Sequence, residues 1–309
     1  MHRRAFLQSG LFAAAAVTCS SVPLLASATT GRPARPAPST WNNDAVTSCW
    51  IGHSTILINM HGTVILTDPV LFDTVGVTLA GKTIGIRRLC APALRLEDIP
   101  KPDLVLLSHA HMDHTDLATL EFITATYPGE VRCICARNTK DIVADLPWRA
   151  CRELDWWDSA SVDDVSVTAV EVLHNGWRYP WERDRREGFI RTGRSYNGYV
   201  LRSRESSLLF AGDTAFTESL RELRGITIDT AFMPIGAYDG FLDNHCTPEQ
   251  AVAMAAALDV RCIAPMHCQT FKQSAEPMRE PMQRFLRELR RHERSSAWSD
   301  IGETIVARG

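Results

Sequence analysis

Between residue 46 and the carboxyl end, short apolar runs alternate with turn-forming residues such as Gly, Pro, Asp and Ser. Short runs bounded in this way are typical of strands. The stretch 71–100 has no strong period, and we expect irregular structure there. The predicted strands cover residues 46–51, 55–59, 64–67, 104–107, 131–136, 165–172, 198–202, 207–211, 230–234 and 260–264.

Three segments have the spacing of helices. Apolar positions predict one helix over about 116–127. Thr247 and Gln250 form a capping box with Pro248 at the first helical position, which predicts a second helix to about residue 258. Apolar residues between 278 and 289 predict a third. Strands and helices alternate through two halves, so an α/β layered sandwich is favoured over a purely parallel wound sheet.

The third predicted helix also carries six arginines opposite its apolar stripe. A basic amphipathic helix can lie on a membrane surface, so contact with a membrane surface is one interpretation. The other is a helix that packs on the core and turns a solvated face outward. Glu280, Glu288 and Glu293 dilute the positive charge, which favours the second interpretation.

Residues 1–28 have the pattern of an export signal. Arg3 and Arg4 precede a modestly apolar, Ala-rich run that ends in Ala-Ser-Ala at 26–28, where a signal would be cleaved. The paired arginines resemble a twin-arginine signal. A membrane anchor is the alternative, but the run is shorter than the roughly 20 residues that a spanning helix needs. We therefore expect a signal peptide over 1–28, a flexible leader over 29–45 and a periplasmic or secreted product.

Composition narrows the class of protein. With 309 residues, of which 45% are hydrophobic and 22% charged, the chain can bury a large core. A formal net charge of -3 argues against a nucleic-acid partner. Nine cysteines are too few for a disulfide scaffold. Cys133 and Cys135 alternate within an apolar run, so we expect them to be buried free thiols.

The strongest chemical signal follows the predicted strand 104–107. His109, His111, Asp113 and His114 lie within six residues, and imidazole and carboxylate groups are good ligands for first-row metals. His174, Asp213 and His267 each follow another predicted strand. Strand ends commonly carry functional side chains. Together these residues provide seven potential ligands, enough for two ions.

Beyond these ligands, several motifs resemble those of the metallo-β-lactamase-fold hydrolases. They are Trp-Ile-Gly-His-Ser at 50–54, Leu-Thr-Asp-Pro at 66–69, the segments 87–89 and 96–100, Asn-His-Cys-Thr-Pro-Glu-Gln-Ala at 244–251, and 267–271. Within that fold the chain is most similar to the branch of N-acyl-phosphatidylethanolamine phospholipase D and the L-ascorbate-6-phosphate lactonases. It departs at Cys268-Gln269, where a Trp-Gly pair is usual, and in a longer segment after His174.

The resemblance implies a four-layer αββα sandwich of two similar halves, formed as one domain over residues 46–309. It implies two zinc ions at one edge, while manganese or iron would also suit the ligands. It assigns the seven residues as follows: His109, His111 and His174 to one ion, Asp113, His114 and His267 to the other, and Asp213 as the bridge.

Three further positions match family positions near the metals. Asp68 and His53 are expected behind the ligands, where such groups fix the tautomer of a ligand imidazole. His245 matches a position that faces the substrate. A hydroxide bridging the two ions would be the nucleophile. Asp113 and Asp213 would be anionic ligands, with Asp213 also orienting the nucleophile, and His245 would protonate the leaving group.

The segment after His174 suggests an anionic substrate. Trp177, Tyr179 and Arg183 are candidate substrate-binding residues there, because aromatic rings and arginines beside a metal site suit an anionic ester. The alternative is an exposed loop of mixed charge, since three acidic residues accompany five arginines.

Taken together, these features predict an exported zinc-dependent hydrolase acting on a phosphodiester or phospholipid-like ester, a small-molecule or lipid partner. A lactonase or other carboxylic-ester hydrolase of the same fold is the nearest alternative. From other classes, an iron-dependent oxidoreductase and a non-catalytic binding protein stay open. The second would predict missing ligands, and all seven are present.

Overall fold

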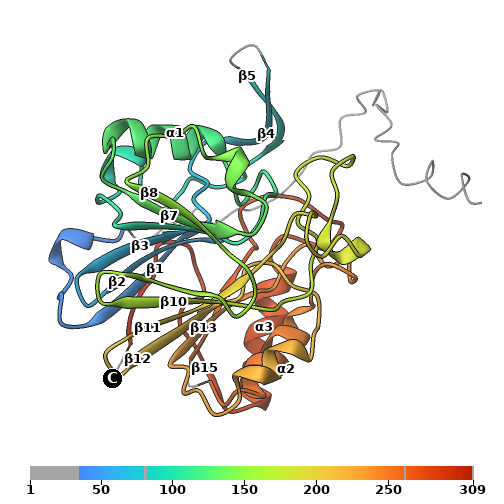
Figure 1. The fold of residues 1–309 in the computed structure, drawn as a ribbon. Coiled ribbons are helices and arrows are strands. Elements are labelled where there is room, and N and C mark those ends of the chain that lie inside the picture. Colours follow the sequence, from blue (N-terminus) through green and yellow to red (C-terminus); the bar gives the residue numbers. More distant parts are fainter. Residues whose placement is uncertain (1–34, 80–81, 261, 308–309) are drawn as a thin grey trace, which may run out of the picture. The chain divides into compact units, whose positions relative to one another are not determined.

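Two seven-stranded sheets lie face to face in the computed structural model, which describes residues 35–79, 82–260 and 262–307 (Figure 1). The first sheet has the order β16-β1-β2-β3-β6-β7-β8. Its β3, β6, β7 and β8 run parallel. The strands are β1 (Val46–Gly52), β2 (Thr55–Met60), β3 (Thr63–Thr67), β6 (Leu104–Leu107), β7 (Arg132–Ala136), β8 (Ala150–Leu154) and β16 (Thr304–Ala307).

The second sheet repeats this plan with the order β15-β14-β13-β12-β11-β10-β9. Its β12 to β15 run parallel, and its other pairs are antiparallel. The strands are β9 (Ser159–Val162), β10 (Val165–Val170), β11 (Gly198–Ser203), β12 (Ser206–Phe210), β13 (Thr230–Pro234), β14 (Cys262–Met266) and β15 (Ser295–Ser296).

Helices cover the outer faces of both sheets. On the first sheet lies α1 (Leu117–Thr126), which begins after Asp116, whose carboxylate accepts a hydrogen bond from the Thr119 N–H. On the second lie α2 (Pro248–Ala256) and α3 (Glu280–Arg291). The capping box predicted for Thr247 and Gln250 is present at the start of α2. Helix, sheet, sheet and helix form four layers, so the predicted αββα sandwich is confirmed.

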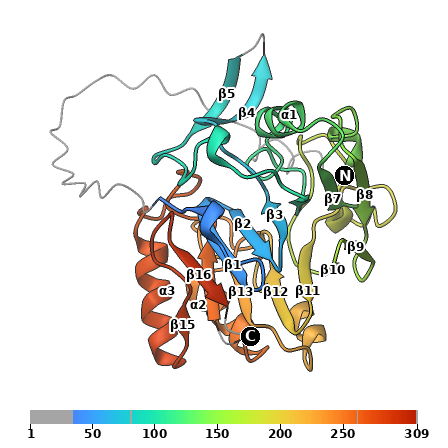
Figure 2. The same cartoon turned by 90° about the vertical axis from the view of Figure 1, so that its left-hand side faces the viewer.

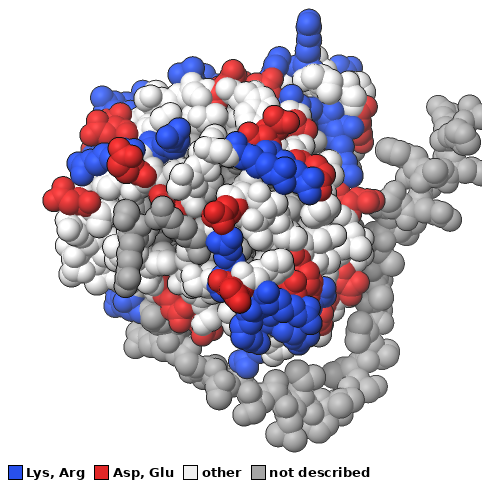
Figure 3. Space-filling model, turned by 90° about the horizontal axis from the view of Figure 1, so that it is seen from below, with Lys and Arg blue, Asp and Glu red and all other residues white. Residues whose placement is uncertain are grey.

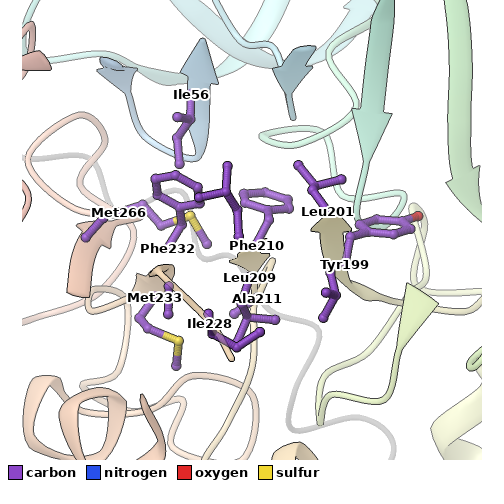
Figure 4. Close-up of a cluster of buried hydrophobic side chains, with 14 of the residues drawn as sticks. Ile56, Tyr199, Leu201, Leu209, Phe210, Ala211, Ile228, Phe232, Met233 and Met266 are labelled. Atoms are coloured by element: carbon purple, nitrogen blue, oxygen red, sulfur yellow. The ribbon is translucent and has the colours of Figure 1, made fainter. Parts of the chain in front are cut away.

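The main core fills the space between the sheets. Ile56 of β2 points toward Phe210 and Phe232 of the opposite sheet, with Met266 beside them (Figure 4). A second cluster lies between the first sheet and α1, and it includes the free thiols of Cys133 and Cys135, which are buried as expected. Burial of both faces of the central strands explains why they appear in the sequence as continuous apolar runs.

The predicted strands are confirmed, but the expectation of irregular structure over 71–100 is wrong in part. A two-stranded sheet of β4 (Thr74–Leu79) and β5 (Lys82–Arg87) lies there, and it extends beyond α1 (Figure 2). Its alternation of apolar residues with Thr and Gly is regular, but the strands are short and pair only with each other. Strands β8, β9, β15 and β16 also went unpredicted, because their exposed residues interrupt any apolar run.

The last helix packs as a core helix. Met282, Phe285 and Leu289 of α3 are buried, so its apolar stripe is not available to a membrane. Figure 3 shows the face that bears α2 and α3, where acidic residues accompany a cluster of basic ones. No helix within the described residues has the length and hydropathy needed to cross a membrane.

The predicted signal peptide lies outside the described residues, as does the leader up to residue 34. The rest of the predicted leader contacts the domain. The Arg35 guanidinium lies 2.6 Å from the Asp98 carboxylate, and Trp41 packs against the outer core of the first sheet. Packing therefore begins before residue 46, where the first strand starts.

Candidate metal centre

The predicted ligands converge at one edge of the sandwich. Parallel strands deliver the residues that follow them to the same edge of a sheet. In the first sheet Asp68 follows β3, and the segment His109–His114 follows β6. In the second sheet Asp213 follows β12, and His267 follows β14. Residues from four strand ends therefore form a single cluster.

The imidazoles of His109, His111 and His174 form one potential ligand trio, with donor atoms all within 4.8 Å of one another. His111 Nδ1 lies 2.8 Å from His109 Nε2 and 3.3 Å from His174 Nε2. The outer nitrogens have partners: Ser108 Oγ lies 2.9 Å from His109 Nδ1, and His174 Nδ1 donates to the Asn244 carbonyl. These bonds leave the inner nitrogens available for a cation.

Asp113, His114 and His267 form a second group, and His53 lies within it. Asp113 Oδ2 is 3.4 Å from His114 Nε2 and 3.5 Å from His267 Nε2. His53 Nε2 is 2.9 Å from the same oxygen. His53 was expected behind the ligands, and its position against Asp113 suits that role, because it can donate to a carboxylate that ligates a metal.

Asp213 lies between the two groups. Its Oδ2 is 3.0 Å from His267 Nε2 and 3.1 Å from His114 Nε2, both in the second group. The same oxygen is 3.9 Å from His174 Nε2, in the first group. The Asp213 Oδ1 atom is buried without a hydrogen-bond partner in the described part of the chain. This is the placement that the bridging assignment requires.

Asp68 is completely buried behind His114. Its Oδ2 accepts a hydrogen bond from His114 Nδ1 at 2.7 Å, and its Oδ1 accepts one from the Ser108 N–H at 2.7 Å. A carboxylate on Nδ1 fixes the tautomer of His114 and leaves Nε2 free. This position agrees with the role expected for Asp68.

The cluster fits a transition metal on the chemistry of its donors. Buried nitrogen and oxygen atoms are nearly always hydrogen-bonded in proteins. Among the described residues six buried atoms at the centre have no hydrogen-bond partner: His111 Nε2, His114 Nε2, His267 Nε2 and Nδ1, His245 Nδ1 and Asp213 Oδ1. Imidazole and carboxylate donors suit zinc, manganese and iron. A cation would satisfy the atoms that the protein leaves unpaired.

The imidazoles of the centre differ in the direction in which their pKa is shifted. Burial lowers the pKa of His111 to about 4 and that of His109 and His174 well below the usual range, so these rings stay neutral, as metal ligands must. Burial also lowers the pKa of His267, but the charge of Asp213 and the hydrogen bonds to Asp113 and Asp213 together outweigh burial and raise this pKa to about 9. The second group therefore holds a proton that a metal would displace.

Backbone conformation at the centre is unusual. His53, Asp68 and His267 have φ values of 52°, 32° and 57°, in the left-handed region that residues with a Cβ rarely occupy. Gly212, directly before Asp213, has φ 59°, and a Cβ there would lie 2.8 Å from Ser108 Cβ. Strained backbone of this kind gathers at functional sites. The close approach at Gly212 brings the ends of the two sheets together.

Two of the candidate substrate residues lie at the cluster. The Trp177 ring meets the His111 ring edge to face at a centroid distance of 5.0 Å. His245 Nδ1 is 3.7 Å from Asp213 Oδ2, and its side chain is 14% exposed. His111 and Asp113 are likewise only partly buried. The opening of the centre is therefore on the side of these residues.

The other two candidates, Tyr179 and Arg183, lie elsewhere. Tyr179 stacks on Trp181, with ring centroids 4.9 Å apart. The guanidinium of Arg183 lies over the Phe189 ring, in a groove that contains none of the predicted ligands. Their predicted substrate role has no support in this geometry, because the chain turns away from the metal ligands after Trp177.

Several charged residues of this segment hold the fold together. Arg194 is 2.6 Å from Glu182, and Arg185 pairs with Asp155 and stacks on Trp156. The backbone N–H groups of Trp177 and Arg186 donate to Asp184. Internal pairing favours the mixed-charge interpretation of these arginines over direct substrate binding.

Two residues that position the ligands were not predicted. The Gln273 side-chain amide donates to Asp113 Oδ2 at 2.6 Å. The Arg178 guanidinium donates to the carbonyls of Ala110 and Thr115, which holds the metal-binding turn in place. Neither contact had a signal in the sequence, because both join positions 63 or more residues apart.

The fold and this donor set together define a metal-dependent hydrolase of the metallo-β-lactamase type. The family described as "Beta-lactamase superfamily domain" matches residues 63–268, and the chain belongs to it. The resemblance proposed from the motifs is thereby confirmed.

Among similar curated proteins is an uncharacterised protein of Mycobacterium tuberculosis, 30% identical over 277 residues, which cover 85% of this chain and 71% of that protein. An N-acyl-phosphatidylethanolamine-hydrolyzing phospholipase D of Saccharomyces cerevisiae is 27% identical, over 78% of this chain and 51% of its own length. A metal-dependent hydrolase of Bacillus thuringiensis is 30% identical, over 71% and 84%.

Among solved structures, a novel metallo hydrolase from the archaeon Ignicoccus hospitalis superposes with a TM-score of 0.62. The match covers 86% of this chain and 99% of that one at 17% identity. At this identity the likeness concerns the fold alone, and it agrees with the observed sandwich.

Proposed function

We propose that this protein is an exported, dinuclear zinc-dependent hydrolase that cleaves a phosphodiester in a lipid-like anionic ester. The observation that carries the proposal is the pairing of two ligand groups with Asp213 between them. His109, His111 and His174 would hold one ion, Asp113, His114 and His267 the other. Bound zinc would supply an activated water at neutral pH and a Lewis acid for the ester oxygen.

The chain's own residues have distinct tasks in this proposal. Asp213 would orient the attacking water and accept its proton, since its carboxylate is held between both groups. His245 would give a proton to the leaving oxygen, because it borders Asp213 and retains some exposure. Trp177 would form an apolar wall for the substrate beside His111.

A lipid-like substrate is supported by exposed apolar residues that lie close in sequence to Asp213 and His245. Phe216, three residues after Asp213, is 43% exposed, and Phe241 and Leu242, just before His245, are 49% and 57% exposed. Exposed apolar side chains near a site favour an apolar ligand. The yeast relative is named for a phospholipid substrate.

Export is proposed from residues 1–28 alone. Replacing Arg3 and Arg4 by Lys should retain a tagged full-length chain in the cytoplasmic fraction, because twin-arginine export depends on that pair. Equal amounts of the variant and the parent chain in the periplasmic fraction would rule the route out.

Activity is tested by metal analysis of protein purified without added metal, followed by phosphodiester, lactone and β-lactam substrates. We expect about two zinc ions per chain and preferential hydrolysis of the phosphodiesters. Faster turnover of lactones than of phosphodiesters would favour the lactonase alternative. A metal content far below two that zinc does not restore would refute the dinuclear site.

A further inference from the structure

The hairpin of β4 and β5 has one apolar face that is open to solvent. Cross-strand partners share a face of a two-stranded sheet. The register pairs Val75 with Ile86, Val77 with Ile84 and Leu79 with Lys82, which lines up five aliphatic residues on one face. Of these, Val75 is buried at the base, whereas Val77 is 45% exposed, Ile84 65% and Leu79 67%. The opposite face carries Thr, Gly and, at the base, Arg87, with the Thr78 and Thr83 hydroxyls 3.2 Å apart.

The charge of this segment differs from that of the whole chain. Residues 74–96 contain four cationic residues and no Asp or Glu, although the formal net charge of the protein is -3. Lys82 and Arg87, at the two ends of β5, are exposed and have no ion-pair partner among the residues that the structure describes. Lys82 shares the apolar face, and a cation beside exposed apolar side chains complements anionic lipid headgroups above acyl chains.

The base of the hairpin is tied to the metal centre. Arg88, the residue after β5, forms a β-bridge with Phe271, and the Leu89 N–H donates to the Thr270 carbonyl at 2.8 Å. The Thr270 hydroxyl accepts a hydrogen bond from the His53 N–H, and the Phe271 ring meets the His53 ring edge to face at 5.0 Å. The base of the hairpin is therefore held against His53, which contacts the candidate ligand Asp113.

A second copy of the chain fits this face less well than a lipid surface. The exposed apolar face consists of four side chains, whereas a stable protein interface takes about 20 residues from each partner. Two copies paired through it would also bring two segments of positive charge together, with no acidic residue in 74–96 to offset them.

We propose that the hairpin Thr74–Arg87 docks this protein on an anionic phospholipid surface. Its exposed aliphatic side chains enter the headgroup boundary, and Lys82, on the same face, contacts lipid phosphates. Docking brings the metal centre to the layer that contains its ester. Faster turnover through docking rests on the proposed function, because it requires a lipid substrate. Docking itself does not require one.

Vesicle co-sedimentation of the purified full chain tests the docking. We expect binding to phosphatidylcholine vesicles that contain about a quarter phosphatidylglycerol, and weaker binding to phosphatidylcholine alone. The double variant Val77→Thr/Ile84→Thr keeps β-branched residues in both strands and should bind at least about tenfold more weakly. Lys82→Gln should weaken binding about fivefold.

Val306→Thr is the matched control, because Val306 is 55% exposed on β16, outside the hairpin. It should bind vesicles as the parent chain does. Equal binding by the parent chain and the hairpin double variant would overturn the proposal. So would a dimer in analytical ultracentrifugation that the double variant dissociates while vesicle binding is unchanged, since the face would then join two copies.

Activity assays distinguish a failure of the docking proposal from a failure of the proposed function. Hairpin variants should hydrolyse a small soluble phosphodiester at the parent rate and an ester embedded in vesicles about tenfold more slowly. If the parent chain hydrolyses no ester of any class, the proposed function fails, and vesicle binding still decides the docking. If it hydrolyses the embedded ester and the hairpin variants do so equally well, the docking proposal fails alone.

Discussion

Asp213 is the residue that contacts both groups of candidate ligands. Its Oδ2 lies within 4 Å of an imidazole from each ligand group, and its side chain is 1% exposed. Burial raises the pKa of Asp213, but the charges of His114 and His267 outweigh burial and hold it well below the usual range. Asp213 is therefore an anion whose removal affects both groups at once.

Asp213→Asn should lower both zinc content and hydrolysis. Replacing residues that merely support a ligand costs about 10- to 100-fold in affinity or activity, so loss of a shared anionic ligand should cost more than about 100-fold in kcat/KM. Zinc per chain by mass spectrometry and initial rates measure the effect. Asp163→Asn is the control, since Asp163 is 49% exposed and pairs only with Arg132. An Asp213→Asn protein with two zinc ions and full activity would contradict the bridging role.

His245→Gln should retain metal but slow catalysis in a way that depends on the leaving group. A positioned general acid contributes about 100-fold or more, and mainly where the leaving oxygen is basic. We expect that loss in kcat for an alkyl phosphodiester and little change for a nitrophenyl ester. An equal loss for both esters would mean that His245 acts through binding and does not donate the proton.

Among the elements, the turn between β12 and Asp213 decides how closely the sheets meet. Gly212 has φ 59°, and a Cβ there would lie 2.8 Å from both the Asn197 carbonyl oxygen and Ser108 Cβ. A glycine allows this backbone conformation and leaves room for the neighbouring chain. The centre is therefore assembled by contacts between strand ends as well as by the ligands.

Gly212→Ala should displace Asp213 and reduce zinc content, with a loss of activity of about 100-fold or more, comparable to loss of a ligand partner. Gly225→Ala is the control that tests backbone strain without a steric clash. Gly225 also has a positive φ, of 90°, but a Cβ there would meet nothing within 4 Å. It should cost about 1–2 kcal/mol of unfolding free energy and leave zinc content unchanged. Equal zinc content in the two variants would show that the close approach at Gly212 is unimportant.

Helices and strands could be predicted where burial produces a recognisable pattern of apolar residues in the sequence. They were missed where it does not. The central strand β6 is buried along its whole length and appears as Leu-Val-Leu-Leu. The capping box at Thr247 is local, so it could be recognised from neighbouring residues. Strand β8 alternates exposed and half-buried residues and owes its place to pairing with β7. Such strands depend on a partner that the local sequence does not specify.

For the whole molecule, the centre makes stability depend on pH. Burial lowers the pKa of five imidazoles below the value of about 6.5 expected in the unfolded chain. They are His53 at about 3, His111 and His245 at about 4, and His109 and His174. Below pH about 6.5 the unfolded state takes up protons that the folded state excludes, so the free energy of unfolding falls.

His114 and His267 act in the opposite direction. Burial lowers their pKa, but the charges of neighbouring aspartates, Asp213 foremost, and hydrogen bonds to these aspartates together outweigh burial and raise the pKa, to about 9 for His267. Their stabilisation is complete below pH about 6.5 and is lost as pH rises through about 9. Because five lowered groups oppose two raised ones, metal-free protein should lose stability between pH about 6.5 and 4. Urea unfolding of chelator-treated protein at pH 7 and 5 measures this, and a higher midpoint at pH 5 would contradict it.

The sequence by itself determined the layered α/β class, the central strands and a set of candidate metal ligands, because those features are local runs, spacings and motifs. Only the tertiary structure decided how the ligands group, with Asp213 within reach of both sets. It also separated Trp177, at His111, from Tyr179 and Arg183, which turn away. It added Gln273 and Arg178, whose contacts span distant positions. Such contacts arise only when strand ends far apart in the chain meet at one edge.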